Sequence, residues 1–255
     1  MTDTLRITSR DNPLLKRLRL MARDNTAHRK LGQVWLEGDH LCRAFLARGL
    51  RPDLAIFSES NGYPALDGYD ISAIKNFVLP DALMRDISGL ESAASMGFVV
   101  DLPLSPQLAP SEPSVVLDRV QDAGNVGSIL RSASAFGYTQ VLAIKGTAAL
   151  WSPKVLRAGM GAHFGLRLVE GLAPADLSAL QVPVLVTSSH HGEWVHRAAL
   201  PWPCAWVMGH EGQGVSDEVL SGTVHPIRIA QPGGEESLNV AAAAAICLHA
   251  SAAKP

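Results

Sequence analysis

Long hydrophobic runs are missing from this sequence of 255 residues, and their absence excludes one class of protein. No run of about 18 apolar residues occurs, so the sequence predicts no transmembrane helix. The opening stretch, MTDTLRITSRDNP, lacks the apolar core of a secretory signal. With 47% hydrophobic and 18% charged residues, the composition is typical of a globular protein.

Cysteine is also scarce, which argues against a disulfide framework and a zinc ribbon. Cys42, Cys204 and Cys247 are odd in number, lie far apart and form no CxxC pair. The pair His190-His191 has no third metal ligand spaced nearby, so we expect exposed loop histidines and no bound metal. A reducing, cytoplasmic setting is therefore expected.

Charge is low overall but unevenly distributed. The net charge is −2, yet residues 1–51 contain eleven Lys or Arg and only five Asp or Glu, which makes this segment +6 and the remainder −8. A basic front end on an acidic body suggests an anionic partner such as nucleic acid. A solvated amphipathic helix is the alternative that charge alone leaves open.

A linker divides the chain. Residues 101–113 are rich in proline and serine and are typical of an extended connection. We therefore expect a first domain at 1–100, which contains the basic segment that suggests a nucleic-acid partner, and a second domain at 114–255. In the first, a small α/β unit is predicted from helices that begin at Asn12, Asp39 and Pro80 and from strands at 33–36, 54–57, 76–79 and 96–100.

The second domain alternates short apolar runs with helical patterns, as in a doubly wound parallel sheet. The predicted strands are residues 115–117, 141–144, 183–186, 205–208 and 224–229. The chain closes with an alanine-rich helix at 238–250 that is apolar all round. Such a helix must be buried, and we expect one of its faces to meet a second copy of the chain.

Three polar loops follow predicted strands in this domain, at residues 120–127, 209–214 and 231–239. Ligands of open α/β sheets bind beyond the carboxyl ends of strands, so these loops can converge on one site. In the first loop, Gly124, Asn125 and Gly127 predict a tight turn, followed by a helix from Ser128. Arg131 then lies near the helix N-terminus, where a cation costs about 0.3–1 kcal/mol. An exposed arginine with a weak ion pair is the alternative.

The three loops together resemble the motifs of the SpoU (TrmH-like) RNA ribose 2′-O-methyltransferases, which belong to the SPOUT class. The matching residues are Asn125-x-Gly127-x-x-x-Arg131, Gly209-x-Glu211-Gly212-x-Gly214 and Glu236-Ser237-Leu238-Asn239-Val240. Trp35-Leu36-Glu37-Gly38-x-His40-Leu41 is similar to a strand-to-helix turn of the family's substrate-binding domain.

The resemblance implies a fold, a cofactor and an assembly. The fold is a parallel α/β domain with a deep C-terminal trefoil knot, preceded by a small L30e-like domain. The cofactor is S-adenosyl-L-methionine, bound in the knot, and the assembly is a homodimer in which two chains complete each site. The implied catalytic residues are Arg131, Asn125, Glu211, Ser237 and Asn239. Gly209, Ile229 and Leu238 are implied to line the cofactor pocket.

The sequence departs from the family pattern at the rim of this site. Ala230-Gln231 stands where Pro-Met is usual, His210 where Asn or Ala is common, and Gln213 where a basic residue is common. The expected activity is 2′-O-methylation of structured RNA, most simply rRNA. Alternatives are a tRNA 2′-O-methyltransferase and a catalytically silent RNA-binding protein. A nucleotide-binding oxidoreductase is excluded because no GxGxxG follows the first strand with an acid about twenty residues later.

Overall fold

The computed structural model describes residues 4–61, 74–88, 92–222, 224–233 and 237–253, and the chain forms two compact units. The first unit comprises Met1–Leu104 and Trp151–Phe164, and the second comprises Ser105–Leu150 and Gly165–Pro255. The sequence predicted one uninterrupted domain from residue 114 onwards. Residues 151–164 belong instead to the first unit, because Leu156 is buried in its core and Trp151 and Phe164 pack against the same core.

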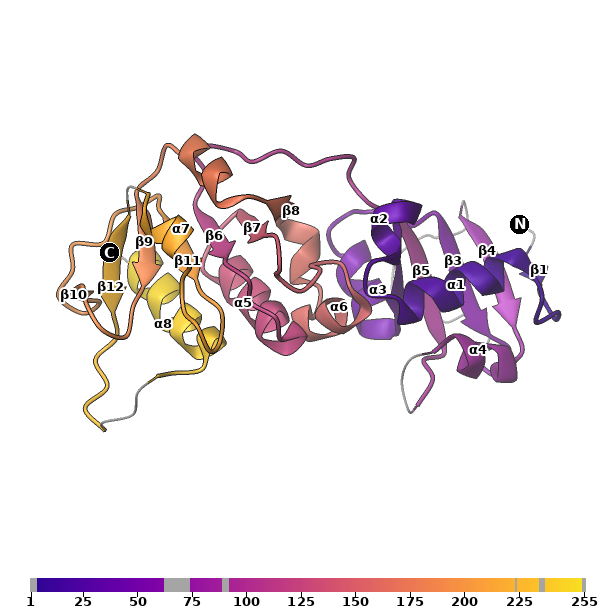
Figure 1. Ribbon diagram of the computed structural model, residues 1–255. Helices are drawn as coiled ribbons and strands as arrows, with labels where there is room; N and C mark the ends of the chain where they lie inside the picture. Colours follow the sequence, from indigo (N-terminus) through magenta and orange to yellow (C-terminus); the bar gives the residue numbers. More distant parts are fainter. Residues whose placement is uncertain (1–3, 62–73, 89–91, 223, 234–236, 254–255) are drawn as a thin grey trace. The chain divides into compact units, whose positions relative to one another are not determined.

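In its described residues, the first unit is built on a five-stranded mixed sheet (Figure 1). The strand order is β1-β4-β3-β5-β2, in which β5 runs antiparallel to both of its neighbours. The elements are β1 (Leu5–Arg6), α1 (Pro13–Arg23), α2 (Ala27–Leu31), β2 (Gln33–Glu37), α3 (Asp39–Leu46), β3 (Leu54–Ser58), β4 (Lys75–Leu79), α4 (Asp81–Ile87), β5 (Met96–Asp101) and α6 (Pro153–Gly159), followed by the 3-10 helix η1 (Ala162–Gly165).

Both faces of this sheet are buried. Successive side chains along each strand point to opposite faces, and each face packs against a core of its own. Leu36, Phe57 and Phe98 point into one core, which also contains side chains of α3 and α6. Their neighbours Trp35, Ile56 and Val99 point into the other core, with side chains of α1 and α4. The short apolar strands predicted from the sequence are confirmed, whereas β1 and α2 were not predicted.

The second unit contains a parallel sheet with the strand order β10-β12-β9-β11-β6-β7-β8. Every pairing between neighbouring strands in this sheet is parallel. The elements are β6 (Ser114–Leu117), α5 (Ala123–Ala135), β7 (Gln140–Ile144), β8 (Arg167–Leu172), the 3-10 helix η2 (Pro174–Ala179), β9 (Val184–Thr187), β10 (Glu193–Trp194), β11 (Ala205–Met208), α7 (Asp217–Leu220), β12 (His225–Arg228) and α8 (Val240–Ala252).

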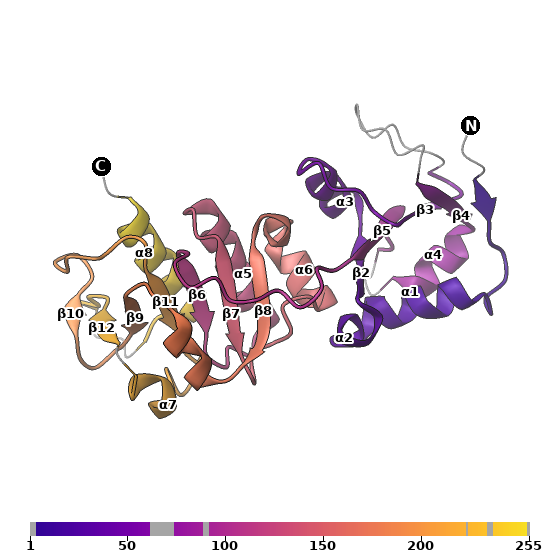
Figure 2. The same cartoon turned by 90° about the horizontal axis from the view of Figure 1, so that it is seen from above.

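Helices cover both faces of this parallel sheet. Helices α5 and α8 pack against each other on one side, and α7 lies on the other (Figure 2). Trp206 of β11 is fully buried and donates to Ser251 Oγ of α8 at 2.8 Å, while the next residue, Val207, joins the core beneath α7 and η2. The parallel α/β sheet predicted from the sequence is confirmed. The trefoil knot and the L30e-like fold of the first unit stay predictions.

Within the described ranges, no helix has the length and apolar character needed to cross a membrane.

Candidate active site

Three loops lie at the carboxyl ends of strands in the second unit. Loop 1 (residues 118–122) connects β6 to α5, loop 2 (209–216) connects β11 to α7, and loop 3 (229–239) connects β12 to α8. Because the strands are parallel, their carboxyl ends share one edge of the sheet. Glu236 of the third predicted motif lies outside the described residues, whereas Ser237, Leu238 and Asn239 lie within them.

Helix α5 begins at Ala123, so the tight turn predicted at Gly124 to Gly127 is wrong. Asp122 caps the helix, and its Oδ1 accepts from Asn125 N at 2.8 Å. Such a cap stabilises a helix by about 1 kcal/mol. Gly124 and Gly127 each destabilise it by about 0.5–1 kcal/mol, so the cap offsets much of their cost. Arg131 therefore lies past the middle of the helix, where the predicted dipole penalty does not apply.

Glu211 connects loop 2 to loop 1. Its Oε1 accepts hydrogen bonds from Asp122 N and Asn125 Nδ2, both at 3.1 Å, and its Oε2 accepts from Gln121 N at 3.2 Å. Partial burial by itself raises the pKa of this carboxyl, but the hydrogen bonds from Asn125, Asp122 and Gln121 outweigh burial. The pKa of Glu211 is lowered as a result, and the side chain is a carboxylate at neutral pH.

A directional chain of hydrogen bonds continues from Asn125 to helix α8. The Nδ2 of Asn125 donates to Glu211, so the Oδ1 of Asn125 faces Asn239. The Nδ2 of Asn239 donates to this oxygen at 2.9 Å. The Oδ1 of Asn239 accepts from Ala241 N at 2.9 Å and from Ala242 N at 3.2 Å, which caps α8. Side chains thus link all three loops, and the convergence that the sequence predicted is confirmed.

Loop 2 is closed on itself at its base. His210 N donates to Gly214 O at 3.0 Å, and Gly214 N donates to His210 O at 2.8 Å. A Cβ on Gly209 would collide with the backbone of Gly214 and Val215, so only glycine permits this approach. The Nδ1 of His210 accepts from Gly212 N at 3.0 Å and from Gln213 N at 3.2 Å. This histidine, a departure from the family pattern, therefore shapes the loop from within.

The remaining predicted site residues lie outside this hydrogen-bond chain. Arg131 is exposed on α5, and Ser237 is exposed on loop 3; neither forms a hydrogen bond or ion pair with another residue that the structure describes. Leu238 is 40% exposed, Ile229 is half-buried and Gly209 is buried. Among the described residues of one chain, no hydrogen bond or ion pair joins Arg131 to Asn125 or Glu211.

Two residues of loop 1, Asp118 and Arg119, were missed by the sequence reasoning. Asp118 is fully buried, and Arg119 adopts a left-handed backbone with φ of 60°. The Oδ2 of Asp118 accepts from Ser216 N at 2.6 Å, and Arg119 Nη1 donates to Gln213 Oε1 at 2.9 Å. An acid directly after a buried strand was the available signal, because a charge seldom stands there without a partner.

The other candidates behave as ordinary packing or surface residues. His190 and His191 are exposed, as predicted, and the described part of the chain contains no cluster of three or more His, Cys, Asp or Glu residues suited to a metal ion. Trp206 is a fully buried core residue. Trp202 is 44% exposed and meets the Tyr138 ring edge-on, with the ring centroids 5.1 Å apart.

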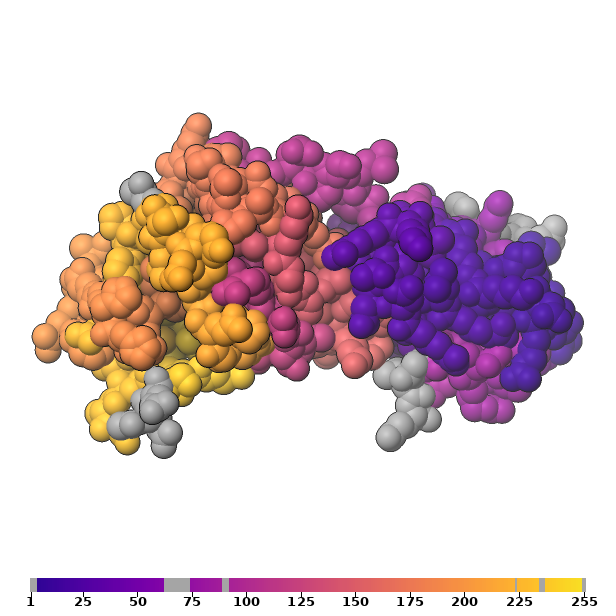
Figure 3. All heavy atoms as spheres, in the orientation of Figure 1, coloured from indigo at the N-terminus to yellow at the C-terminus, as the bar shows by residue number. Residues whose placement is uncertain are grey.

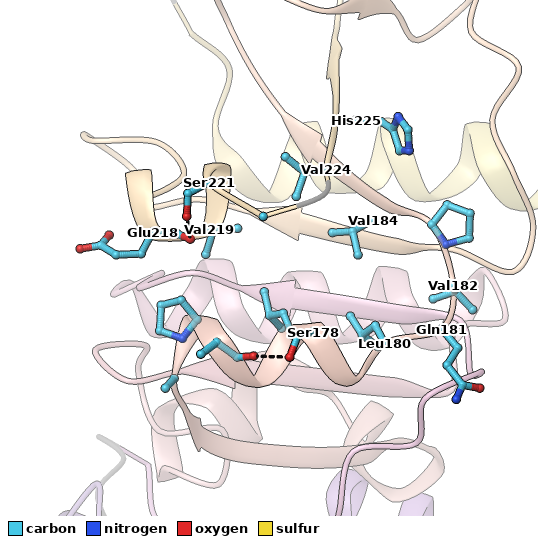
Figure 4. A pocket seen from close by; sticks show the side chains of 16 residues that line it. Ser178, Leu180, Gln181, Val182, Val184, Glu218, Val219, Ser221, Val224 and His225 are labelled. Carbon is cyan, nitrogen blue, oxygen red and sulfur yellow. Dashed lines mark hydrogen bonds between the residues drawn. The ribbon is translucent and has the colours of Figure 1, made fainter.

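A cavity of about 860 Å³ lies away from the three loops, between η2 and the segment from α7 to β12 (Figure 4). Leu180, Val182, Val184 and Val224 give it an apolar lining. Val184 and His225 begin β9 and β12, so the cavity opens at the amino ends of these strands. It is therefore separate from the candidate active site.

Comparisons with known proteins agree on one family. The model of the SpoU rRNA Methylase family matches residues 112–249. An uncharacterized tRNA/rRNA methyltransferase of Synechocystis sp. is 32% identical, over 97% of this chain and 93% of its own length. The 23S rRNA (guanosine(2553)-2′-O)-methyltransferase RlmP of Bacillus subtilis is 29% identical, over 86% of this chain and 88% of its own length.

Solved structures show the same fold. A protein of Porphyromonas gingivalis assigned to the TrmH family of RNA methyltransferases superposes with a TM-score of 0.80 at 28% identity, covering 93% of this chain and 96% of its own. The SpoU methyltransferase AviRb of Streptomyces viridochromogenes, solved with AdoMet, superposes with a TM-score of 0.82 at 19% identity, covering 94% and 97%.

Proposed function

Because the chain belongs to the SpoU rRNA methylase family, we propose that it transfers a methyl group from S-adenosylmethionine to a ribose 2′-hydroxyl of structured RNA, with rRNA as the substrate. The observation that carries this proposal is the hydrogen-bond chain from Glu211 through Asn125 to Asn239, which ties the three motif loops together. The activity for which the Bacillus subtilis relative is named supports both the 2′-oxygen as acceptor and rRNA as substrate.

The residues of loops 2 and 3 fit the cofactor. Gly209 allows the backbone of loop 2 to fold back on itself, so that backbone groups and no side chain form this part of the loop. Leu238 and Ile229 present apolar surface on loop 3 that the chain itself does not fully cover. An adenine prefers an apolar slot with a few backbone contacts, and these groups provide one. S-adenosylmethionine supplies an electrophilic methyl group on its sulfonium.

The polar residues of the site have separate parts in this proposal. Glu211, held ionised, fixes the orientation of Asn125, which in turn fixes Asn239 at the start of α8. Ser237, exposed next to Asn239, positions the target nucleotide. The guanidinium of Arg131 carries donor groups only, so it acts as a planar hydrogen-bond donor to RNA phosphate and to the oxyanion that develops on the ribose.

A second copy of the chain completes the site in this proposal. Arg131 shares the exposed stripe of α5 with Ser128 and Ala135, and α5 packs against α8. Helix α8 also presents apolar surface that the chain leaves open, because Ile246 is 41% exposed. A dimer across α5 and α8 would cover this surface and bring one chain's Arg131 towards its partner.

The proposal is tested by following a labelled methyl group from S-adenosylmethionine into RNA with the full chain. Separate incubations with rRNA and tRNA, followed by digestion and mass analysis, identify the methylated nucleoside. Incorporation as a 2′-O-methyl nucleoside of rRNA is expected. Incorporation only into tRNA supports the tRNA alternative, methylation of a base contradicts the ribose assignment, and RNA binding without methylation supports the silent RNA-binding alternative.

Arg131→Ala should abolish methyl transfer and leave cofactor binding within about twofold, because Arg131 lies on α5 and not on loops 2 or 3. Arg131→Lys should fail as well, since a point charge does not reproduce the planar guanidinium. Arg167→Ala is the control, because Arg167 lies at the amino end of β8, whereas the three loops lie at the carboxyl ends of strands. Calorimetry with S-adenosylhomocysteine measures binding, and an equal loss of binding and turnover would contradict the assigned role.

A further inference from the structure

Asp118 carries a buried charge that the proposed chemistry does not use. It follows β6, and its N–H donates to Met208 O at 2.9 Å, which extends the pairing of β6 with β11. The side chain is completely buried, with Oδ2 accepting from Ser216 N at 2.6 Å and Oδ1 from Arg119 Nε at 3.1 Å. A buried carboxylate is very unfavourable without such donors, so its presence here needs an explanation.

Arg119 attaches loop 1 to loop 2 at a second point. Its Nη1 donates to Gln213 Oε1 at 2.9 Å, and its N–H donates to Thr147 Oγ1 at 3.1 Å. The backbone of Arg119 is left-handed, which is uncommon for a residue with a long side chain and must be held by its surroundings. A basic residue in place of Gln213 would repel Arg119. The hydrogen bond between Arg119 and loop 2 therefore depends on glutamine at position 213.

Asp118 holds the end of loop 2, and Arg119 and Glu211 hold its tip. Ser216 ends loop 2 and is the N-cap residue of α7, whereas Gln213 and Glu211 lie in the tip that the His210–Gly214 bridge closes. The Asp118 carboxylate and the Arg119 guanidinium of loop 1 therefore bind Ser216 and Gln213 of loop 2, and the Glu211 carboxylate of loop 2 binds loop 1 in return. Three separate contacts thus join the two loops.

We propose that Asp118 and Arg119 are positioning residues: they hold loop 2 so that the backbone around Gly209 and the Glu211 carboxylate stand in the geometry that binds the cofactor. The inference rests on the proposed function for the identity of the ligand. A buried acid that only stabilises the core would affect unfolding but would leave the ordering of loop 2 and its coupling to Glu211 unchanged.

Asp118→Asn tests this proposal with little change of shape. Ser216 N and Arg119 Nε face different oxygens of Asp118, and asparagine replaces one of these oxygens by an NH2 group, so one of the two donors loses its acceptor. With the folded state retained, the dissociation constant for S-adenosylhomocysteine should rise about tenfold by calorimetry. Backbone amides of 209–216 should lose protection from hydrogen exchange while those of β7 keep theirs. Unchanged affinity and unchanged exchange in a folded Asp118→Asn variant would overturn the proposal.

Glu170→Gln is the matched control, because this carboxylate accepts from Leu150 N at 2.7 Å in the same unit and does not belong to the three loops. Its affinity for S-adenosylhomocysteine should stay within twofold. A double-mutant cycle of Asp118→Asn with Glu211→Gln should be non-additive in affinity, since both act through loop 2. Additive effects would indicate a purely structural role for Asp118.

If Asp118→Asn does not fold, Gln213→Ala tests the positioning role instead. Gln213 is exposed, so its loss should leave unfolding unchanged while weakening affinity about threefold and loosening 209–216. Unchanged affinity and exchange in this variant would overturn the proposal. If the wild-type chain binds S-adenosylhomocysteine but methylates no RNA, the proposed function fails and the positioning role stands. If it does not bind S-adenosylhomocysteine, both fail.

Discussion

The carboxylate of Glu211 illustrates how one residue can order a site before any ligand arrives. It accepts hydrogen bonds from two backbone N–H groups and from the Asn125 amide, which together fill most of its acceptor capacity. Since Asn125 must donate to Glu211, it can only accept from Asn239. The ionised state of one acid thus determines how two amides are oriented, and preorganised donors of this kind are what catalysis at a developing charge requires.

We expect the free energy of unfolding to report this ionisation. The folded-state pKa of Glu211 lies below its ordinary value of 4.5, so the carboxylate stabilises the fold above about pH 4.5 and loses this contribution as the pH falls through the lowered pKa. Glu211→Gln should remove it, and the stability difference from wild type should shrink below pH 4.5. Urea unfolding between pH 3 and 7 measures this difference.

Glu218→Gln is the matched control for the acid dependence. Its carboxylate is exposed on α7 and accepts no hydrogen bond from any residue in the described part of the chain. The stability of this variant should follow that of the wild type at every pH. A pH-independent gap between Glu211→Gln and wild type would show that Glu211 acts through packing and not through its charge.

At the scale of elements, the sequence predicted the paired apolar strands well and the start of α5 poorly. Strands such as β6 and β11 are short, continuously buried apolar runs, and their length and their alternation with helical patterns identify them. The start of α5 depends on Asp122, whose cap allows a helix through Gly124 and Gly127. The stabilisation by the cap and the cost of the two glycines are similar in size. Glycine content alone therefore predicted a turn where the chain forms a helix.

Other elements depend on partners that are distant in sequence. Strand β8 carries an exposed Arg167 and a left-handed Gly171, and it is defined by its pairing with β7 rather than by its own pattern. Strand β10 has two residues and pairs only with β12 in the described sheet. Helix α6 packs with the first unit although it follows β7 in the chain. Local periodicity does not predict which strand another strand pairs with or which unit a helix packs against.

Helix α1 is the element on which we expect RNA affinity to depend. Leu15, Leu18 and Met21 are buried, whereas Lys16 is exposed, and Lys30 is exposed at the end of α2. In the orientation of Figure 1, these two helices lie at the surface of the first unit, where Figure 3 shows residues of the indigo N-terminal segment. A cationic helical surface of this kind binds phosphates without reading the base sequence.

Lys16→Glu combined with Lys30→Glu should therefore weaken RNA binding and leave S-adenosylhomocysteine binding unchanged. Each phosphate contact that is lost should reduce the slope of log affinity against log salt by about one. Arg167→Glu makes half of this charge change, at a single site in the second unit, and should leave the slope unaltered. Filter binding at several salt concentrations measures both quantities, and equal slopes for all variants would assign RNA binding to another surface.

At the scale of the whole molecule, the sequence identified the family motifs but not the completeness of the site within one chain. Asn125, Glu211 and Asn239 meet in the folded chain, because the strands that carry their loops share one edge of the sheet. Arg131 remains exposed on α5, the helix that packs against α8. No local pattern distinguishes a residue that awaits a partner chain from one that faces solvent.

The dimer prediction follows from the two kinds of residue on α8. Ala244 is fully buried within the chain, so Ala244→Trp should overpack the core, at a cost of about 1–3 kcal/mol or more, and give unstable or insoluble protein. Ile246 is 41% exposed, so Ile246→Arg should leave the fold of each chain intact. A charge on this surface should instead prevent the partner chain from docking, because an unpaired arginine would be buried in the interface.

We therefore expect Ile246→Arg to be a soluble, folded monomer that binds RNA and has lost most of its methyl transfer. Leu104→Arg is the control, since Leu104 is a 95% exposed apolar residue that belongs to the first unit. Light scattering gives the mass, thermal unfolding checks the fold and methyl incorporation gives the activity. A fully active monomer at micromolar concentration would show that one chain holds a complete site, and Arg131 would then have to reach the ribose from its own α5.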